Sequence, residues 1–198
     1  MSAIDAANAW RGGCLQCFAQ AEEAATETLL ALNAVEARGG DVRLEAEANR
    51  FSALLLMPPQ ILREELRKIR QPKVTDIVRL SDLFDVSKDA MAISYVEHSR
   101  HPVAVVVARN GRVLRSYHDT GNFPWISVSN GQPVPAGSTC HDGFLPGAVS
   151  DIEECDPELW FSERDAGMVD IFTEQVLGQR DGYSLILTYC RIEGRGRR

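Results

Sequence analysis

The sequence lacks the features that mark several common classes of protein. No apolar run approaches the roughly 20 residues that a membrane-spanning helix needs, and the first residues do not follow the basic-then-apolar order of a secretion signal. The phosphate-binding patterns G-x-x-x-x-G-K and G-x-G-x-x-G are absent, and so is the serine-hydrolase pattern G-x-S-x-G. These absences argue against the enzyme classes that such motifs define. They also predict a cytoplasmic chain with no membrane partner.

Cysteine is scarce and odd in number. Five cysteines in 198 residues favour reduced thiols over a disulfide framework, in agreement with a cytoplasmic location. Cys14 and Cys17 form a C-x-x-C pair, which binds zinc where a second pair of ligands lies nearby. The only adjacent candidate, Cys140 with His141, lies far along the chain. Ordinary thiols are therefore the simpler interpretation, and a zinc site is the alternative.

The charge balance is acidic, with 28 acidic against 21 basic residues and a formal net charge of −7. Such a balance argues against general adhesion to nucleic acid, so direct nucleic-acid binding is not expected. One basic patch stands out, formed by Arg63, Arg67, Lys68, Arg70, Lys73 and Arg79. A charge run of this kind is most often a solvated helix face. The apolar content of 44% suits one compact domain or two small ones.

The first half of the chain predicts helices. Apolar spacing and stop signals place them at residues 17–37, 42–57, 59–69, 75–84 and 88–98. Ser87 is the expected cap of the last helix. The turn at residues 85–87 resembles a helix-turn-helix, but the second helix offers Lys88 as its only base. A packed helical pair is therefore favoured over contact with DNA.

After Pro102 the pattern changes to strands. A β-branched run at residues 103–108, an Asn110-Gly111 turn and a second run at 112–117 predict a hairpin, and residues 183–192 alternate as a closing strand. Residues 118–162 predict long loops with short strands, while residues 168–177 are ambiguous between helix and strand. Aromatic side chains in this half either line a ligand pocket or fill the core, and the core is favoured: Phe123, Trp125, Trp160 and Phe161.

The stretch from Glu45 to Pro59, E-A-E-A-N-R-F-S-A-L-L-L-M-P-P, carries the most information. Its apolar positions 44, 48, 51 and 55 form one stripe of an amphipathic helix, and Glu45 lies at the edge of that stripe. Prolines 58 and 59 end the helix. From spacing alone, an edge glutamate is most often a solvated or capping residue.

The pattern E-x-E-A-N-x-F-x-x-x-L-L-M-P resembles the segment that follows the zinc-binding helix in the bacterial ImmA/IrrE family of metallopeptidases. The likeness continues through L-S-D-L-F-D-V-S-K-D-A at residues 80–90 and, more weakly, covers roughly residues 42 to 190. The resemblance implies zinc as cofactor, Glu45 as the third zinc ligand, cleavage of helix-turn-helix repressors that regulate transcription, and a sensor-like carboxyl half.

The departure from that family concerns the other zinc ligands. The family supplies two imidazoles and a general base from an H-E-x-x-H helix before the glutamate, whereas the first histidine of this chain is His98. We therefore expect no catalytic residues and no bound zinc, with Glu45 a vestigial ligand. A lost helix, an upstream start and a changed reading frame all remain open, and the composition before residue 40 favours an altered or truncated amino terminus.

The sequence thus predicts an α+β fold: a helical peptidase-type half followed by a mixed, mainly antiparallel sheet domain. The expected divisions are an atypical segment at 1–41, a helical part at 42–101, a sensor-like domain at 102–192 and a basic tail at 193–198. Two functions remain. One is a zinc metallopeptidase-family protein, inactive here as a pseudoenzyme. The alternative is a non-catalytic regulator that binds a repressor-like partner or a small ligand.

Overall fold

The computed structural model of the chain describes residues 41–192. The predicted helix at 17–37, the Cys14 and Cys17 pair and the basic tail lie outside these residues. The described chain divides into two compact units. Within the described range, the first unit comprises residues 41–62 and 83–86, and the second comprises residues 63–82 and 87–192.

The first unit is helical. Helix α3 spans Asp41–Leu56, as the apolar spacing predicts, and α4 spans Pro59–Arg67, of which the residues through Leu62 belong to this unit. Proline suits the first helical position because its missing N–H has no partner there in any case. Met57 and Leu62 are buried, whereas Leu55 of the predicted apolar stripe is exposed.

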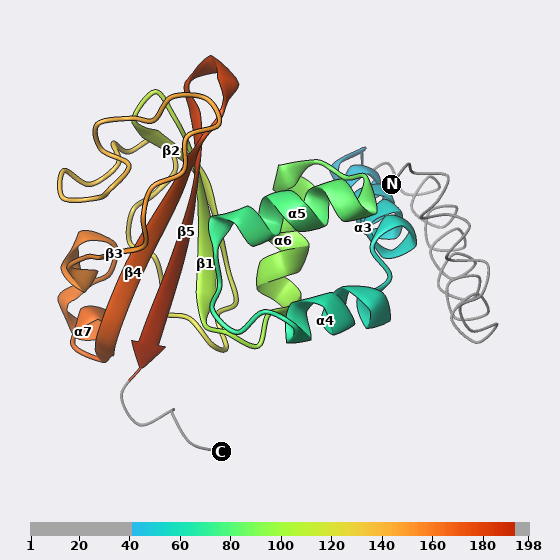
Figure 1. The fold of residues 1–198 in the computed structure, drawn as a ribbon, viewed down its shortest axis with the longest axis horizontal. Helices are drawn as coiled ribbons and strands as arrows, with labels where there is room; N and C mark the ends of the chain where they lie inside the picture. The colour runs from blue at the N-terminus through green and yellow to red at the C-terminus, as the bar shows by residue number, and fades with distance from the viewer. Residues whose placement is uncertain (1–40, 193–198) are drawn as a thin grey trace. The chain divides into compact units, whose positions relative to one another are not determined.

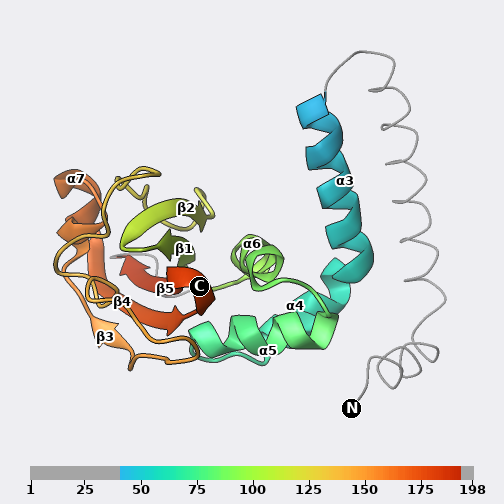
Figure 2. The same cartoon turned by 90° about the horizontal axis from the view of Figure 1, so that it is seen from above.

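The second unit places helices on one face of an antiparallel sheet. Helix α5 spans Val74–Phe84, and its residues through Asp82 belong to this unit. Helix α6 spans Lys88–His98, and both helices lie on the same face of the sheet (Figure 1, Figure 2). Ser87 caps α6, as predicted, by accepting a hydrogen bond from the Ala90 N–H at 3.1 Å. Helix α6 packs against strands β1 and β2.

The sheet has five strands in the order β2-β1-β5-β4-β3, and every pairing between them is antiparallel. Their bounds are β1 Val103–Arg109, β2 Arg112–His118, β3 Glu153–Glu154, β4 Val169–Gly178 and β5 Tyr183–Ile192. Asn110 and Gly111 both have positive φ angles, of 50° and 71°, which matches the hairpin turn that their sequence predicts. The α+β prediction is confirmed, with helices before the sheet.

The main core lies on the sheet face opposite α5 and α6. Ala104, Val106 and Ala108 point into it from β1, and Ile186 and Cys190 from β5. The long segment between β2 and β4, which includes the short helices η1 (Pro157–Leu159) and α7 (Glu163–Ala166), covers this face (Figure 2). Because both faces of β1 are covered, its first six residues are all buried.

Candidate ligand-binding pocket

Within the described residues, the structure brings no predicted zinc ligands together. Glu45 belongs to helix α3, but its side chain is outside the described part of the structure, so its role as a vestigial ligand stays a prediction. Among the described residues, no group of three or more His, Cys, Asp or Glu side chains is arranged to hold a metal ion. Cys140 is buried, and its neighbour His141 is exposed.

Three of the four predicted aromatics belong to the core. Phe123, Trp160 and Phe161 are at most 4% exposed, which confirms the core interpretation for them. Trp125 is 65% exposed, so the core interpretation is wrong for it, and it does not line either of the two pockets described below. It follows the end of β2, and its ring packs against that of His118 in a T-shaped arrangement with centroids 5.1 Å apart.

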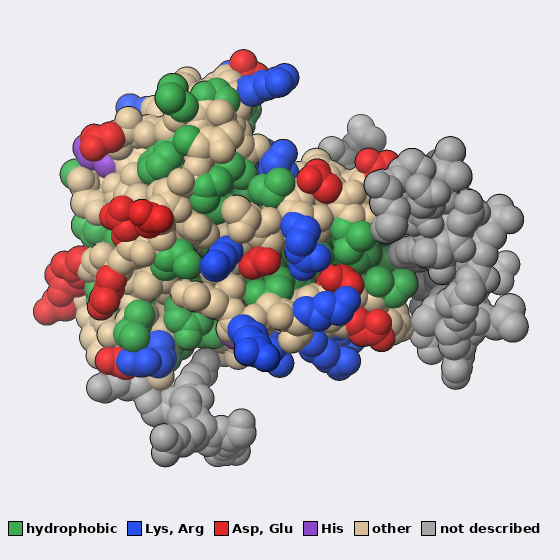
Figure 3. Space-filling view, viewed as in Figure 1, with side chains coloured by type: hydrophobic (Ala, Val, Ile, Leu, Met, Phe, Trp, Pro, Cys, Tyr) green, Lys and Arg blue, Asp and Glu red, His purple; other side chains and the backbone are tan. Residues whose placement is uncertain are grey.

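The basic patch is a solvated face, as predicted. All six of its side chains are exposed. Figure 3 shows several lysine and arginine side chains on the surface of the molecule. Glu65 accepts hydrogen bonds from Lys68 and, at 3.2 Å, from Arg79. The hydrogen bond from Lys68 is the main cause that lowers the pKa of Glu65. The patch is therefore partly neutralised by its own carboxylate.

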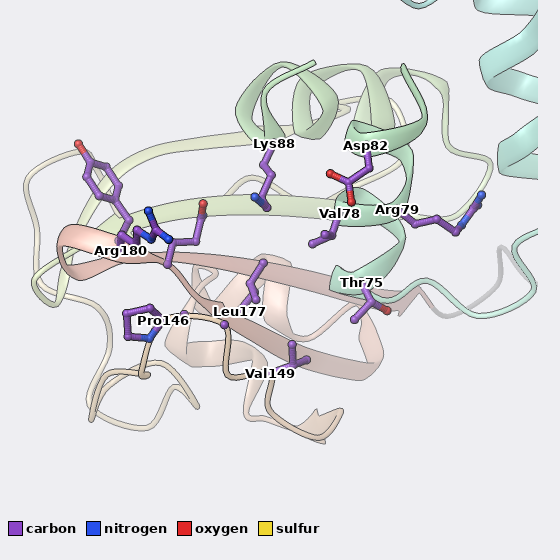
Figure 4. A pocket seen from close by; sticks show the side chains of 13 residues that line it. Thr75, Val78, Arg79, Asp82, Lys88, Pro146, Val149, Leu177 and Arg180 are labelled. Atoms are coloured by element: carbon purple, nitrogen blue, oxygen red, sulfur yellow. The ribbon is translucent and has the colours of Figure 1, made fainter. Parts of the chain in front are cut away.

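A pocket of about 1100 Å³ opens beside helix α5 and the end of strand β4 (Figure 4). We call it the α5–β4 pocket. Its lining comes from three stretches of the second unit: Thr75, Val78, Arg79, Asp82 and Lys88; Pro146, Gly147 and Val149; and Leu177, Gly178, Gln179, Arg180 and Tyr183. The volume lies slightly above the usual range for small-molecule sites, roughly 300–1,000 Å³.

Gly178 allows the lower wall of the pocket, which residues 146–149 form, to lie close to strand β4. The 144–148 segment passes so close to β4 that a Cβ atom at Gly178 would lie 2.2 Å from the Leu145 carbonyl oxygen. Two backbone hydrogen bonds hold the segment there. The Gly147 N–H donates to the Gly178 carbonyl at 2.8 Å, and the Gly178 N–H donates to the Ala148 carbonyl at 2.9 Å. Only glycine permits this close approach without displacement of the backbone.

Gln175 joins two walls of the pocket. Its side chain is buried at 8% exposure and accepts a hydrogen bond from the Val74 N–H at 2.8 Å, at the start of α5. Its amide donates to the Ser150 carbonyl at 3.2 Å, just after the lower wall. A free N–H at a helix start needs such a partner. The pocket is thus preformed, because helix α5, strand β4 and the 146–150 segment are fixed to one another.

The charge of the α5–β4 pocket is opposite to that of the whole chain. Arg79, Lys88 and Arg180 contribute three cations, and Asp82 contributes one carboxylate. Arg79 extends away from the centre of the pocket and pairs with Glu65 at 3.2 Å (Figure 4). Within residues 41–192, neither Lys88 nor Arg180 forms an ion pair. Two cations are therefore available to a ligand.

A second pocket, of about 620 Å³, is acidic. Asp142, Glu153, Glu154 and Asp156 line it, and no lysine or arginine does. Phe144 and Leu159 supply apolar surface to its lining. Nothing in its side-chain geometry points to a particular ligand.

Glu174 is a fully buried carboxylate next to the acidic pocket. Its Oε2 accepts hydrogen bonds from the Ser138 hydroxyl at 2.8 Å and from the Thr139 N–H at 3.0 Å, and its Oε1 accepts one from the Trp160 indole. Burial raises the pKa of Glu174, and the three donors oppose that shift. This arrangement ties the 138–139 turn and Trp160 to β4, which is a structural role.

Neither a protein-family model nor a curated protein matches the chain. Over the part of the chain that the structure describes, no helix is both long enough and apolar enough to cross a membrane.

Sequence reasoning missed the residues of the α5–β4 pocket. Lys88 was visible as the only base of its helix, and Gly178 as a glycine at the end of a possible strand. Nothing in the sequence indicated that residues near 80, 148 and 178 would share one pocket.

Proposed function

We propose that this chain is a non-catalytic regulatory protein, related in organisation to ImmA/IrrE metallopeptidases, whose second unit binds a small ligand in the α5–β4 pocket. The α5–β4 pocket carries the proposal. It combines a volume of about 1100 Å³ with walls that Gln175 and the Gly178 contact hold in place. A preformed concave site with apolar lining and a few polar groups is the usual form of a small-molecule site.

The sequence supports the non-catalytic part of the proposal. Catalytic zinc needs three protein ligands and an open position for water, and this chain offers no imidazole before His98. The helical form of residues 41–56 agrees with the resemblance around Glu45. On this proposal, the helical part contacts a helix-turn-helix repressor without cleaving it, and ligand in the pocket regulates that contact.

The proposal is tested by a thermal-shift screen of the full chain against small carboxylates, phosphates, amines and neutral metabolites. Val149→Trp is the pocket-blocking variant, because Val149 lines the pocket and is 40% exposed, so a larger side chain is accommodated without disturbing the core. Leu145→Trp is the matched control. It adds the same ring to the same segment at a site that is 79% exposed and outside the pocket lining.

We expect at least one compound class to raise the melting temperature of the wild-type chain and of Leu145→Trp, and not that of Val149→Trp. A screen in which no compound gives a shift that depends on Val149 contradicts the proposal. Cleavage of a repressor by the purified chain would contradict its non-catalytic part.

A further inference from the structure

We infer that the ligand of the α5–β4 pocket is an amphipathic anion: a carboxylate, phosphate or similar head group on a compact apolar body. This inference rests on the proposed function, because it concerns the same pocket, and it adds the chemical class of the ligand.

The cations favour an anionic head group. Lys88, from the start of α6, and Arg180, from the turn between β4 and β5, both line the pocket, and neither forms an ion pair within residues 41–192. The chain as a whole carries a net charge of −7, so this concentration of positive charge is local. Hydrogen bonds between such cations and a carboxylate or phosphate are the strong, charge-assisted kind.

The position of Lys88 strengthens this argument. Lys88 is the first residue of α6, where the backbone N–H groups and the helix macrodipole already contribute positive charge. A cation at this end is electrostatically unfavourable unless an anion lies nearby. Asp89 in the same turn does not serve Lys88, because it pairs with Arg115 at 3.5 Å and accepts a hydrogen bond from the Tyr117 hydroxyl. Asp82 also lines the pocket, but it forms no ion pair with Lys88 within residues 41–192. A bound anion would pair with Lys88 directly.

The apolar surface favours a hydrophobic body. Val78 from α5, Val149 from the lower wall and Leu177 from β4 all line the pocket, and Figure 4 shows Val78 and Leu177 pointing toward its interior, as Lys88 does. Exposed Val149 and half-buried Val78 gain from being covered by an apolar group. A purely ionic ligand, such as free phosphate, would leave this surface in water.

The test uses two fluorescent probes that differ by one charged group. 1-Anilinonaphthalene-8-sulfonate is an amphipathic anion, and N-phenyl-1-naphthylamine is the same apolar body without the sulfonate. Both are titrated into the full wild-type chain, Val149→Trp and Leu145→Trp. They are also titrated into the double variant Lys88→Gln/Arg180→Gln and into Lys73→Gln, which removes a lysine charge from an exposed site outside the pocket. Circular dichroism and melting temperature establish that each variant is folded.

We expect the wild-type chain to bind the sulfonate at least about tenfold more tightly than the neutral probe, since tenfold corresponds to a single modest charge-assisted contact. The double variant is expected to lose that advantage and keep its affinity for the neutral probe. Lys73→Gln and Leu145→Trp should bind both probes as the wild type does, and Val149→Trp should bind neither.

The two proposals fail in different ways. If both probes bind equally, and both are lost in Val149→Trp, the pocket stands and the anionic class is overturned. If neither probe shows binding that depends on Val149, the proposed function fails as well. Sedimentation with anionic phospholipid vesicles distinguishes a soluble ligand from a lipid surface. We expect the chain not to sediment with the vesicles. Sedimentation that Val149→Trp abolishes would overturn the inference that the ligand is soluble.

Discussion

Glu174→Gln should destabilise the second unit, because a carboxamide cannot accept the three hydrogen bonds that the carboxylate accepts. The two carboxylate oxygens serve the Ser138 hydroxyl, the Thr139 N–H and the Trp160 indole N–H. A glutamine has one oxygen. If that oxygen faces Ser138 and Thr139, its NH₂ group faces the Trp160 N–H, and if it faces Trp160, the Thr139 N–H loses its acceptor. Either orientation leaves one buried N–H unpaired.

An unpaired buried donor costs about 1–3 kcal/mol, so the substitution should lower the free energy of unfolding by that amount, less the relief from burying a neutral group. The assay is urea unfolding followed by tryptophan fluorescence and circular dichroism. Glu154→Gln is the matched control, because it removes the same charge from an exposed position on the neighbouring strand β3. The control should leave stability within about 0.5 kcal/mol.

The effect of Glu174→Gln should also depend on pH. Burial raises the pKa of Glu174 above its ordinary value of 4.5. A raised pKa means that the folded state binds more protons than the unfolded state between the two pKa values. The contribution of Glu174 to stability is therefore fully present below 4.5 and is lost as the pH rises through the folded pKa.

The stability difference between wild type and Glu174→Gln should accordingly narrow with rising pH, by at most about 1.4 kcal/mol per pH unit. Unfolding measured between about pH 5 and about pH 8 tests this slope. A difference that widens with pH would refute the reasoning, since it would mean that the three donors outweigh burial. Equal stability of the two proteins at every pH would refute the hydrogen-bond argument itself.

Three further predictions concern the pocket walls and the vestigial zinc ligand. Gly178→Ala should lower the free energy of unfolding by about 1–3 kcal/mol, because its Cβ would lie 2.2 Å from the Leu145 carbonyl oxygen. The control in the same urea assay is Gly167→Ala, whose Cβ would meet its nearest atom at 3.5 Å. Equal effects of the two substitutions would contradict the role of Gly178. Gln175→Ala should lower the free energy of unfolding by about 1–3 kcal/mol and speed backbone hydrogen exchange at the start of α5, because the Val74 N–H loses its acceptor. Unchanged exchange at the start of α5 would contradict the proposed link between α5 and β4. Elemental analysis of the purified chain should find zinc far below about one ion per chain, with no change in Glu45→Ala; near-stoichiometric zinc that Glu45→Ala removes would contradict the non-catalytic proposal.

The helices and the hairpin could be predicted because their signals are local. Ser87 caps α6 through a hydrogen bond within its own turn, and Asn110-Gly111 adopts the positive φ angles that this dipeptide favours. Strand β4 was ambiguous because Glu174 and Gln175 interrupt its apolar pattern. Both are buried, and their partners, Trp160, Ser138, Val74 and Ser150, come from other segments. A polar residue whose partner is distant in sequence looks like a surface residue.

The α5–β4 pocket could not be predicted, for a related reason. Its walls meet only because the 144–148 segment passes over Gly178, and no spacing in the sequence encodes that approach. Lys88 resembled an isolated base on a helix with two carboxylates, and its significance depends on Arg180, which belongs to the turn between β4 and β5. Resemblance pointed instead to Glu45, on α3 in the first unit.

The location of the ligand site is tested most directly by hydrogen–deuterium exchange of the full chain with and without 1-anilinonaphthalene-8-sulfonate at saturation. The account predicts slower exchange with the probe in residues 75–82 of α5, in residues 146–150 and in the end of β4 around Leu177 and Gly178, and no such change in Val149→Trp. Protection that instead falls around Thr139, Glu153 and Cys155 of the acidic pocket, or in helix α3, would contradict it.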